Sequence, residues 1–114
     1  VTLFREIEDA VLTPEEAVAI GLYLNEAVAN ACKYAFPEGA TGTIAVFFNV
    51  NGDGWRFTIE DDGVGADAFT DPGGGLGSQL LSAFATQAQA THHGGPILNG
   101  YRTEMRRESQ TALA

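Results

Sequence analysis

The sequence predicts a two-layer α+β sandwich, in which helices cover one face of a mixed, mainly antiparallel sheet. Three observations lead to this prediction: a long amphipathic segment with a helix start signal, two alternating segments joined by a tight turn, and a second helical segment followed by two strand-like segments. With 114 residues and 45% apolar residues, the chain can bury a real core. We therefore expect residues 1–114 to form a single domain.

The first predicted strand lies within residues 3–12, which mix apolar and acidic side chains as an edge strand can. The long helix has a clear start, because Thr13 is a good N-cap, Pro14 suits the first helical position and Glu16 completes a capping box. It is predicted to continue to about Ala35, because the Phe-Pro-Glu-Gly sequence that follows disfavours helix and favours a turn.

A β-hairpin is predicted next, formed by residues 43–50 and 55–61. Both segments are rich in β-branched and aromatic residues, and the Asn-Gly-Asp-Gly sequence between them is a strong hairpin turn. In the return strand, three apolar side chains fall on one face: Trp55, Phe57 and Ile59. The two strands should therefore be antiparallel, with one face turned towards the core.

The last third of the chain begins with a glycine-rich loop over residues 63–77. A second helix should start near Gly77 or Ser78 and carry four apolar side chains inward: Leu80, Leu81, Phe84 and Ala85. Two further strands are predicted near residues 88–93 and 101–107, connected through Gly94, Gly95, Pro96 and Gly100. Residues 109–114 should fray.

Composition excludes several classes of function. The net charge of −9 repels phosphate backbones and anionic lipids, so nucleic acid and direct membrane contact are poor expectations. No run of about 18 apolar residues and no secretory signal is visible. Cys32 is the sole cysteine, so an internal disulfide is excluded and a cytoplasmic setting fits. Because the chain lacks an initiating Met, we expect it to be part of a longer protein.

One side of the long helix carries an acid, an amide and an amine. Glu26, Asn30 and Lys33 follow the spacing i, i+4 and i+7, which places them within about 60° of arc. The opposite side carries the apolar residues Ala17, Ile20, Leu24, Ala27, Ala31 and Ala35. An amide oxygen can bind Mg²⁺, a lysine can meet phosphate charge, and a carboxylate can orient or deprotonate an attacking group. The alternative is a solvated polar face without a ligand.

Two glycine-rich segments follow the predicted hairpin. At the strand end, a carboxylate can accept a hydrogen bond from the exocyclic amine of adenine, and Asp61 is the first candidate, with Asp62 second. Gly73–Gly77 opens the second helix, where unpaired amides and the helix dipole favour phosphate. The alternatives are an acidic turn and a flexible linker. His92 and His93 are strand neighbours that point to opposite faces, which is poor geometry for a shared metal.

In this order and spacing, the segments resemble the GHKL ATPases, which include sensor histidine kinases, anti-sigma-factor kinases and DNA gyrase. Asn25–Pro37 is similar to the asparagine box, Asp61–Gly65 to the first glycine box and Gly73–Gly77 to the second. The resemblance implies the Bergerat fold, binding of ATP and Mg²⁺, the metal on Asn30 and a catalytic role for Glu26. It implies nucleotide contacts from Asn30, Lys33, Tyr34, Asp61, Gly63, Gly65, Gly75, Leu76 and Gly77.

The resemblance is strongest to sensor histidine kinases of the HWE type and related kinases. It implies transfer of the γ-phosphoryl group of ATP to a histidine on a separate dimerisation domain, with a response regulator as an indirect partner. An anti-sigma-factor serine kinase and a docking domain that has lost ATP are the alternatives. The sequence departs from the family pattern in three places: residues 66–74 lack Lys, Arg and His, no phenylalanine box is recognisable, and Gly100-Tyr101-Arg102 stands where relatives often carry Gly-Thr.

Overall fold

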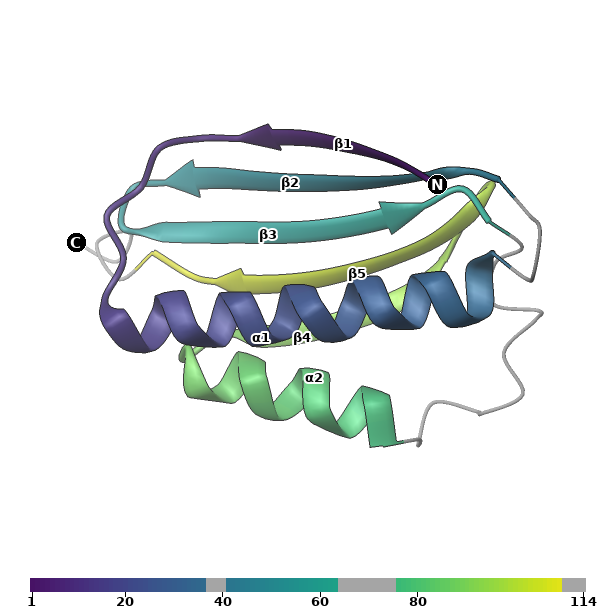
Figure 1. Ribbon diagram of the computed structural model, residues 1–114. Coiled ribbons are helices and arrows are strands. Elements are labelled where there is room, and N and C mark those ends of the chain that lie inside the picture. The colour runs from purple at the N-terminus through teal and green to yellow at the C-terminus, as the bar shows by residue number, and fades with distance from the viewer. Residues whose placement is uncertain (37–40, 64–75, 110–114) are drawn as a thin grey trace.

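The computed structural model describes residues 1–36, 41–63 and 76–109, which form a five-stranded sheet with α1 and α2 on one face (Figure 1). The strand order is β1-β2-β3-β5-β4; β1 runs parallel to β2, and the other neighbours are antiparallel. The elements are β1 (Thr2–Ile7), α1 (Pro14–Asn30), β2 (Thr43–Asn51), β3 (Gly54–Asp61), α2 (Leu76–Gln87), β4 (Thr91–Ile97) and β5 (Gly100–Arg107). The predicted α+β sandwich and its mixed, mainly antiparallel sheet are confirmed.

The long helix starts where the sequence predicts. The Thr13 hydroxyl accepts the Glu16 N–H at 3.1 Å, and the Glu16 carboxylate accepts the Thr13 N–H at 2.9 Å, which is a complete capping box. The predicted end at Ala35 needs a correction, because α1 ends at Asn30 and residues Ala31–Ala35 form a π-helical turn, η1. Such turns inside helices are rare and often lie at functional sites.

The buried side of α1 is centred on residues other than those predicted. Glu16, Ala19, Tyr23 and Ala27 are the buried residues of the helix. Of the predicted apolar set, Ala27 and Ala31 are buried, Ile20 and Leu24 are half-buried, but Ala17 is exposed; the side chain of Ala35 lies outside the described residues. The prediction of Ala17 was wrong because the face was chosen by apolar residues alone, whereas Glu16 and Tyr23 bury polar side chains with hydrogen-bond partners.

The hairpin and the second helix agree closely with expectation. Trp55, Phe57 and Ile59 are all buried on the helix-covered face, and the turn places Asn51 opposite Gly54. The second helix begins slightly early, at Leu76; it buries Leu81 and Ala85, while Leu80 and Phe84 are half-buried. Within the described ranges, no helix has the length and apolar character needed to span a bilayer.

The fourth strand is displaced from its predicted position of 88–93. Helix α2 continues to Gln87, and the strand runs over Thr91–Ile97, so Gly94, Gly95 and Pro96 lie inside it rather than in a connection. Because β4 is at the edge of the sheet, the missing backbone N–H of Pro96 breaks no hydrogen bond on the open side, and the glycines weaken no central strand. The last strand, Gly100–Arg107, begins one residue before the predicted position.

Candidate functional site

Asp61 ends β3 on the helix-covered face and is 9% exposed. Its Oδ1 atom accepts the Gly63 N–H at 3.0 Å, and Tyr101 lies opposite it on β5. Burial raises the pKa of this carboxyl, and the neighbouring Asp62 charge adds to the rise, while the nearby backbone N–H groups of Gly63 and Tyr101 oppose it. Asp61 is thus a buried carboxylate held in place by the backbone, with lone pairs left to accept a ligand's donor.

Asp62, the second candidate, has a different role. Its side chain is exposed, and its Oδ1 atom accepts the Thr43 N–H at 2.7 Å. A Cβ atom at Gly42 would lie 2.7 Å from that same oxygen and would overlap the ring of the buried Phe36. Asp62 therefore connects the end of β3 to the backbone at the start of β2. Because its carboxylate already has this structural role, Asp61 is favoured as the ligand-binding carboxylate.

The predicted polar side of the first helix lies near its C-terminal end. Glu26 and Asn30 are half-buried in the last turns of α1, whereas Lys33 is exposed within η1. The ideal i, i+7 relation between Glu26 and Lys33 does not hold strictly, because π-helical bonding from i to i+5 alters the rotation per residue. Tyr34 also belongs to η1, and its side chain lies outside the described residues.

The predicted glycine contacts are described only in part. Gly63 follows Asp61 directly and donates its N–H to the Asp61 carboxylate. Leu76 and Gly77 form the first turn of α2, where backbone N–H groups have no partner within the helix. Gly65 and Gly75 lie outside the described residues. These contacts remain predictions.

Three parts of the candidate site lie towards one end of the molecule. Figure 1 shows the C-terminal end of α1, the C-terminal end of β3 and the N-terminal end of α2 at the same side. The two helices pack against each other, α1 contacts β3, and α2 contacts β4. A half-buried acid and amide, a buried carboxylate and the amides of a helix start therefore lie towards the same end of the molecule, although they are far apart in the sequence.

The donor set at this end suits a hard cation shared with phosphate. Over residues 1–36, 41–63 and 76–109, no three His, Cys, Asp or Glu side chains are grouped to hold a metal ion. The Asn30 amide oxygen offers one neutral ligand, and the Glu26 carboxylate lies one turn earlier. Mg²⁺ keeps most of its waters and binds through few protein ligands plus phosphate oxygens, so these residues fit it.

A buried polar pair connects α1 to the edge strand β4. The Tyr23 hydroxyl and His92 Nδ1 are 2.7 Å apart, and Tyr23 is fully buried. His92 is half-buried and His93 is exposed, on opposite faces of β4, as the sequence predicts. Burial lowers the pKa of His92 and the charge of His93 lowers it further, while a backbone hydrogen bond with Glu104 opposes the shift, so folding favours the neutral imidazole.

This pair predicts an acid-side loss of stability. Because the folded pKa of His92 lies below the ordinary value of 6.5, the unfolded chain binds more protons as the pH falls through 6.5, and the free energy of unfolding decreases. We expect the loss between pH 7.5 and 5.5, measured by urea denaturation, to be smaller in His92→Gln than in the unsubstituted chain. The exposed His93→Gln should retain most of the loss; equal losses in both variants would contradict this role of His92.

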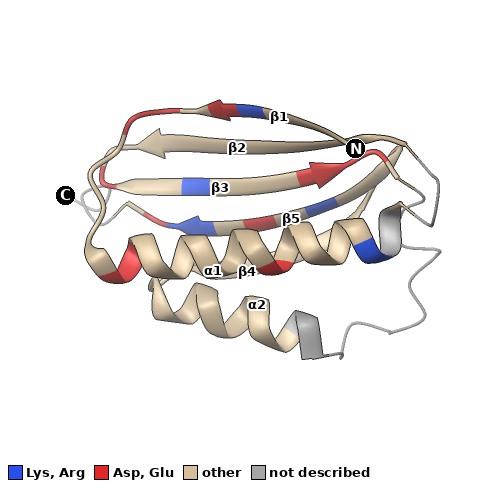
Figure 2. Ribbon diagram, viewed as in Figure 1, with Lys and Arg blue, Asp and Glu red and all other residues tan. Residues whose placement is uncertain are grey.

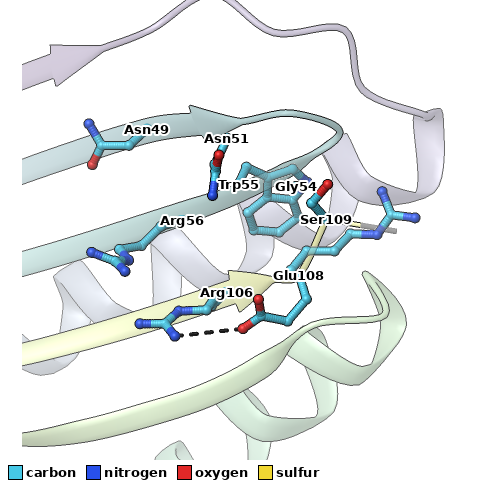
Figure 3. Close-up of a pocket in the computed structure, with 9 residues that line it drawn as sticks. Asn49, Asn51, Gly54, Trp55, Arg56, Arg106, Glu108 and Ser109 are labelled. Carbon is cyan, nitrogen blue, oxygen red and sulfur yellow. Dashed lines mark ion pairs between the residues drawn. The ribbon is translucent and has the colours of Figure 1, made fainter. Parts of the chain in front are cut away.

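The opposite end and the open face of the sheet carry a different chemistry. In Figure 2 basic residues are few and several lie on β3 and β5, where Arg56 pairs with Glu104 at 3.1 Å and Arg102 with Glu60 at 2.7 Å. A cavity of about 330 Å³ lies by the hairpin, and the residues drawn there include Arg56, Arg106 and Glu108 (Figure 3). Because carboxylates already engage these arginines, this cavity is a weaker candidate than the end around Asp61.

Comparisons with known proteins agree with this geometry. The family model described as "Histidine kinase-like ATPase domain" matches residues 2–102. The chain is 37% identical over 93 residues to "Blue-light-activated histidine kinase 2" of Erythrobacter litoralis (strain HTCC2594), covering 75% of this chain but only 27% of that protein.

Solved structures are similar over most of the chain. The histidine kinase domain of the Erythrobacter litoralis EL346 blue-light activated histidine kinase superposes with a TM-score of 0.77 and 25% identity, covering 92% of this chain and 50% of that one. The histidine kinase AdeS of Acinetobacter baumannii shares the fold, with a TM-score of 0.70 at 17% identity, covering 96% of this chain and 56% of that one. The chain thus spans about half or less of the length of these relatives.

Proposed function

Because the chain belongs to the histidine kinase-like ATPase domain family, we propose that it binds Mg-ATP at the end formed by α1, β3 and α2, and donates the γ-phosphoryl group to a histidine on a separate dimerisation domain. The observation that carries the proposal is the buried Asp61 carboxylate at the same end of the molecule as Asn30 and the start of α2. The relatives' greater length fits a module that acts within a larger kinase, and a response regulator would be the indirect partner.

Each residue has a separate task in this proposal. Asp61 accepts a hydrogen bond from the exocyclic amine of adenine, a donor that guanine lacks at that position. Asn30 binds Mg²⁺ through its amide oxygen, Lys33 meets phosphate charge, the Gly77 amide contacts the phosphates, and Gly63, which has no side chain, lets the backbone lie close to the nucleotide. Bound Mg²⁺ neutralises charge on the phosphates. Gly65, Gly75, Tyr34 and Leu76 complete the proposed contacts.

Glu26 is the proposed catalytic residue, one turn before Asn30. In the transfer, the attacking imidazole nitrogen forms a bond to the γ-phosphorus, the bond from that phosphorus to the bridging oxygen breaks, and ADP leaves. The Glu26 carboxylate orients the imidazole and accepts its proton. Its half-buried position favours this task, because a partly desolvated carboxylate interacts more strongly with an imidazole than an exposed one does.

Substitution of Asn30 tests the metal role directly. In the full-length parent kinase, we expect Asn30→Ala to lower the rate of radiolabel transfer from ATP to the acceptor histidine by at least about tenfold, because the metal loses its protein ligand. Asn25→Ala is the matched control, since Asn25 is an exposed amide on the same helix, and it should transfer at the normal rate. Normal transfer in Asn30→Ala would refute the assigned metal role.

A further inference from the structure

Tyr101 is the cross-strand neighbour of Asp61 on the helix-covered face. The register of β3 and β5 places the two residues directly opposite each other. The side chain of Tyr101 is half-buried, and burial together with the Asp61 charge raises the pKa of its phenol. A neutral aromatic residue is therefore the cross-strand partner of the carboxylate at the candidate site.

The Tyr101 ring extends from β5 towards the neighbouring strand β4 and lies over Gly94. A Cβ atom at Gly94 would lie 2.9 Å from the Tyr101 hydroxyl oxygen and 3.5 Å from two ring carbons. A Cβ atom at the next residue, Gly95, would have nothing within 4 Å. The missing side chain at Gly94 thus provides the space that the Tyr101 ring uses.

The backbone of Tyr101 is held as closely as its ring. Gly100 has a φ of +151°, and a Cβ atom there would overlap the carbonyl oxygen of Asp61. The start of β5 is therefore in direct contact with the end of β3, which leaves Tyr101 little freedom to move relative to Asp61. Two glycines, one on each side, fix where the ring can lie.

We propose that the Tyr101 ring forms a wall of the pocket for the purine base, and that Gly94 sets the position of that wall. The proposal rests on the proposed function, because it assigns a further specificity residue to the same nucleotide site. A flat aromatic surface beside a hydrogen-bond acceptor suits a planar base that carries an exocyclic amine. Any side chain at Gly94 moves the hydroxyl end of the ring away from β4 and changes the space left for the base.

Calorimetric titration of the 114-residue chain with Mg-ADP tests this wall. We expect Gly94→Ala to weaken binding at least tenfold, and Gly95→Ala, the matched control, to change it less than twofold. Tyr101→Ala should weaken binding about fivefold or more, because a base loses its stacking surface. Adding Gly94→Ala to Tyr101→Ala should then have less than a twofold further effect, since no ring remains to be displaced.

The outcomes distinguish failure of the proposed nucleotide binding from failure of the proposed role of Tyr101. Failure of the unsubstituted chain to bind Mg-ADP would overturn the proposed function, and this inference with it. If the unsubstituted chain binds Mg-ADP but Gly94→Ala and Gly95→Ala bind it with the same affinity, the role of the Tyr101 ring is refuted while the proposed function stands. Tighter binding by Tyr101→Ala would also refute that role, because the ring would then obstruct the pocket. Thermal melting shows whether each variant folds; if Gly94→Ala does not, Tyr101→Ala alone decides.

Discussion

Asp61→Asn should lower the affinity for Mg-ADP by about a hundredfold while leaving the protein at least as stable as before. The substitution keeps one acceptor oxygen for the Gly63 N–H but replaces the other with an amide donor, which repels the exocyclic amine of adenine. Isothermal titration calorimetry measures the affinity. Asp62→Asn is the control, and it should bind within about threefold of the unsubstituted chain because Asp62 serves the backbone of Thr43.

The stability part of this prediction follows from the direction of the Asp61 pKa. Burial raises that pKa above the ordinary 3.8, so the folded state holds the proton more tightly than the unfolded chain does. The contribution of Asp61 to the free energy of unfolding is therefore greatest below pH 3.8, and it falls as the pH rises through the raised pKa of the folded state. At neutral pH the carboxylate costs stability, and Asp61→Asn should melt at the same or a higher temperature. Lower melting with unchanged affinity would identify Asp61 as a structural residue.

Glu16→Ala should lower the free energy of unfolding by about 3 kcal/mol, since it leaves a largely buried cation without its partner. Glu16 is 7% exposed, and its carboxylate accepts the Trp55 Nε1–H at 2.8 Å and an Arg107 N–H at 2.9 Å. It also completes the capping box with Thr13. Urea denaturation measures the loss. Glu15→Ala, an exposed acid in the same helical turn, should cost less than about 1 kcal/mol.

The same group adds an acid-sensitive contribution. Burial by itself raises the pKa of Glu16, but the hydrogen bonds from Thr13 and Trp55 and the charge of Arg107 outweigh it and leave the pKa below 4.5. The carboxylate's contribution is therefore present above pH 4.5 and is lost as the pH falls through the lowered pKa. A loss in Glu16→Ala no larger than that in Glu15→Ala would show that the network contributes little.

Much of the fold could be predicted because its signals are local. The alternation of residues 43–50 and 55–61 and the Asn-Gly-Asp-Gly turn determine the hairpin, and Thr13 and Glu16 determine the start of α1. The position of β4 could not be predicted, because an edge strand accepts glycine and proline that a central strand would reject. The buried side of α1 was misjudged because Tyr23 and Glu16 find polar partners far away in the sequence.

The candidate site shows the same division. Asp61 could be placed at a strand end, and Glu26 and Asn30 on one side of a helix, from spacing alone. The pairing of Asp61 with Tyr101 depends on the register of β3 and β5, which are separated by a helix and another strand, so no local pattern contains it. The π-helical turn after Asn30 is equally invisible in an ideal helical wheel.

The most direct test is an NMR titration of the isotope-labelled chain with Mg-ADP. The backbone amides of Gly63 and Tyr101 and the side-chain amide of Asn30 should shift together along one saturable curve with a single dissociation constant. Shifts confined to Asn49, Arg56 and their neighbours on the open face of the sheet, or separate curves for Gly63 and Asn30, would contradict a shared nucleotide site.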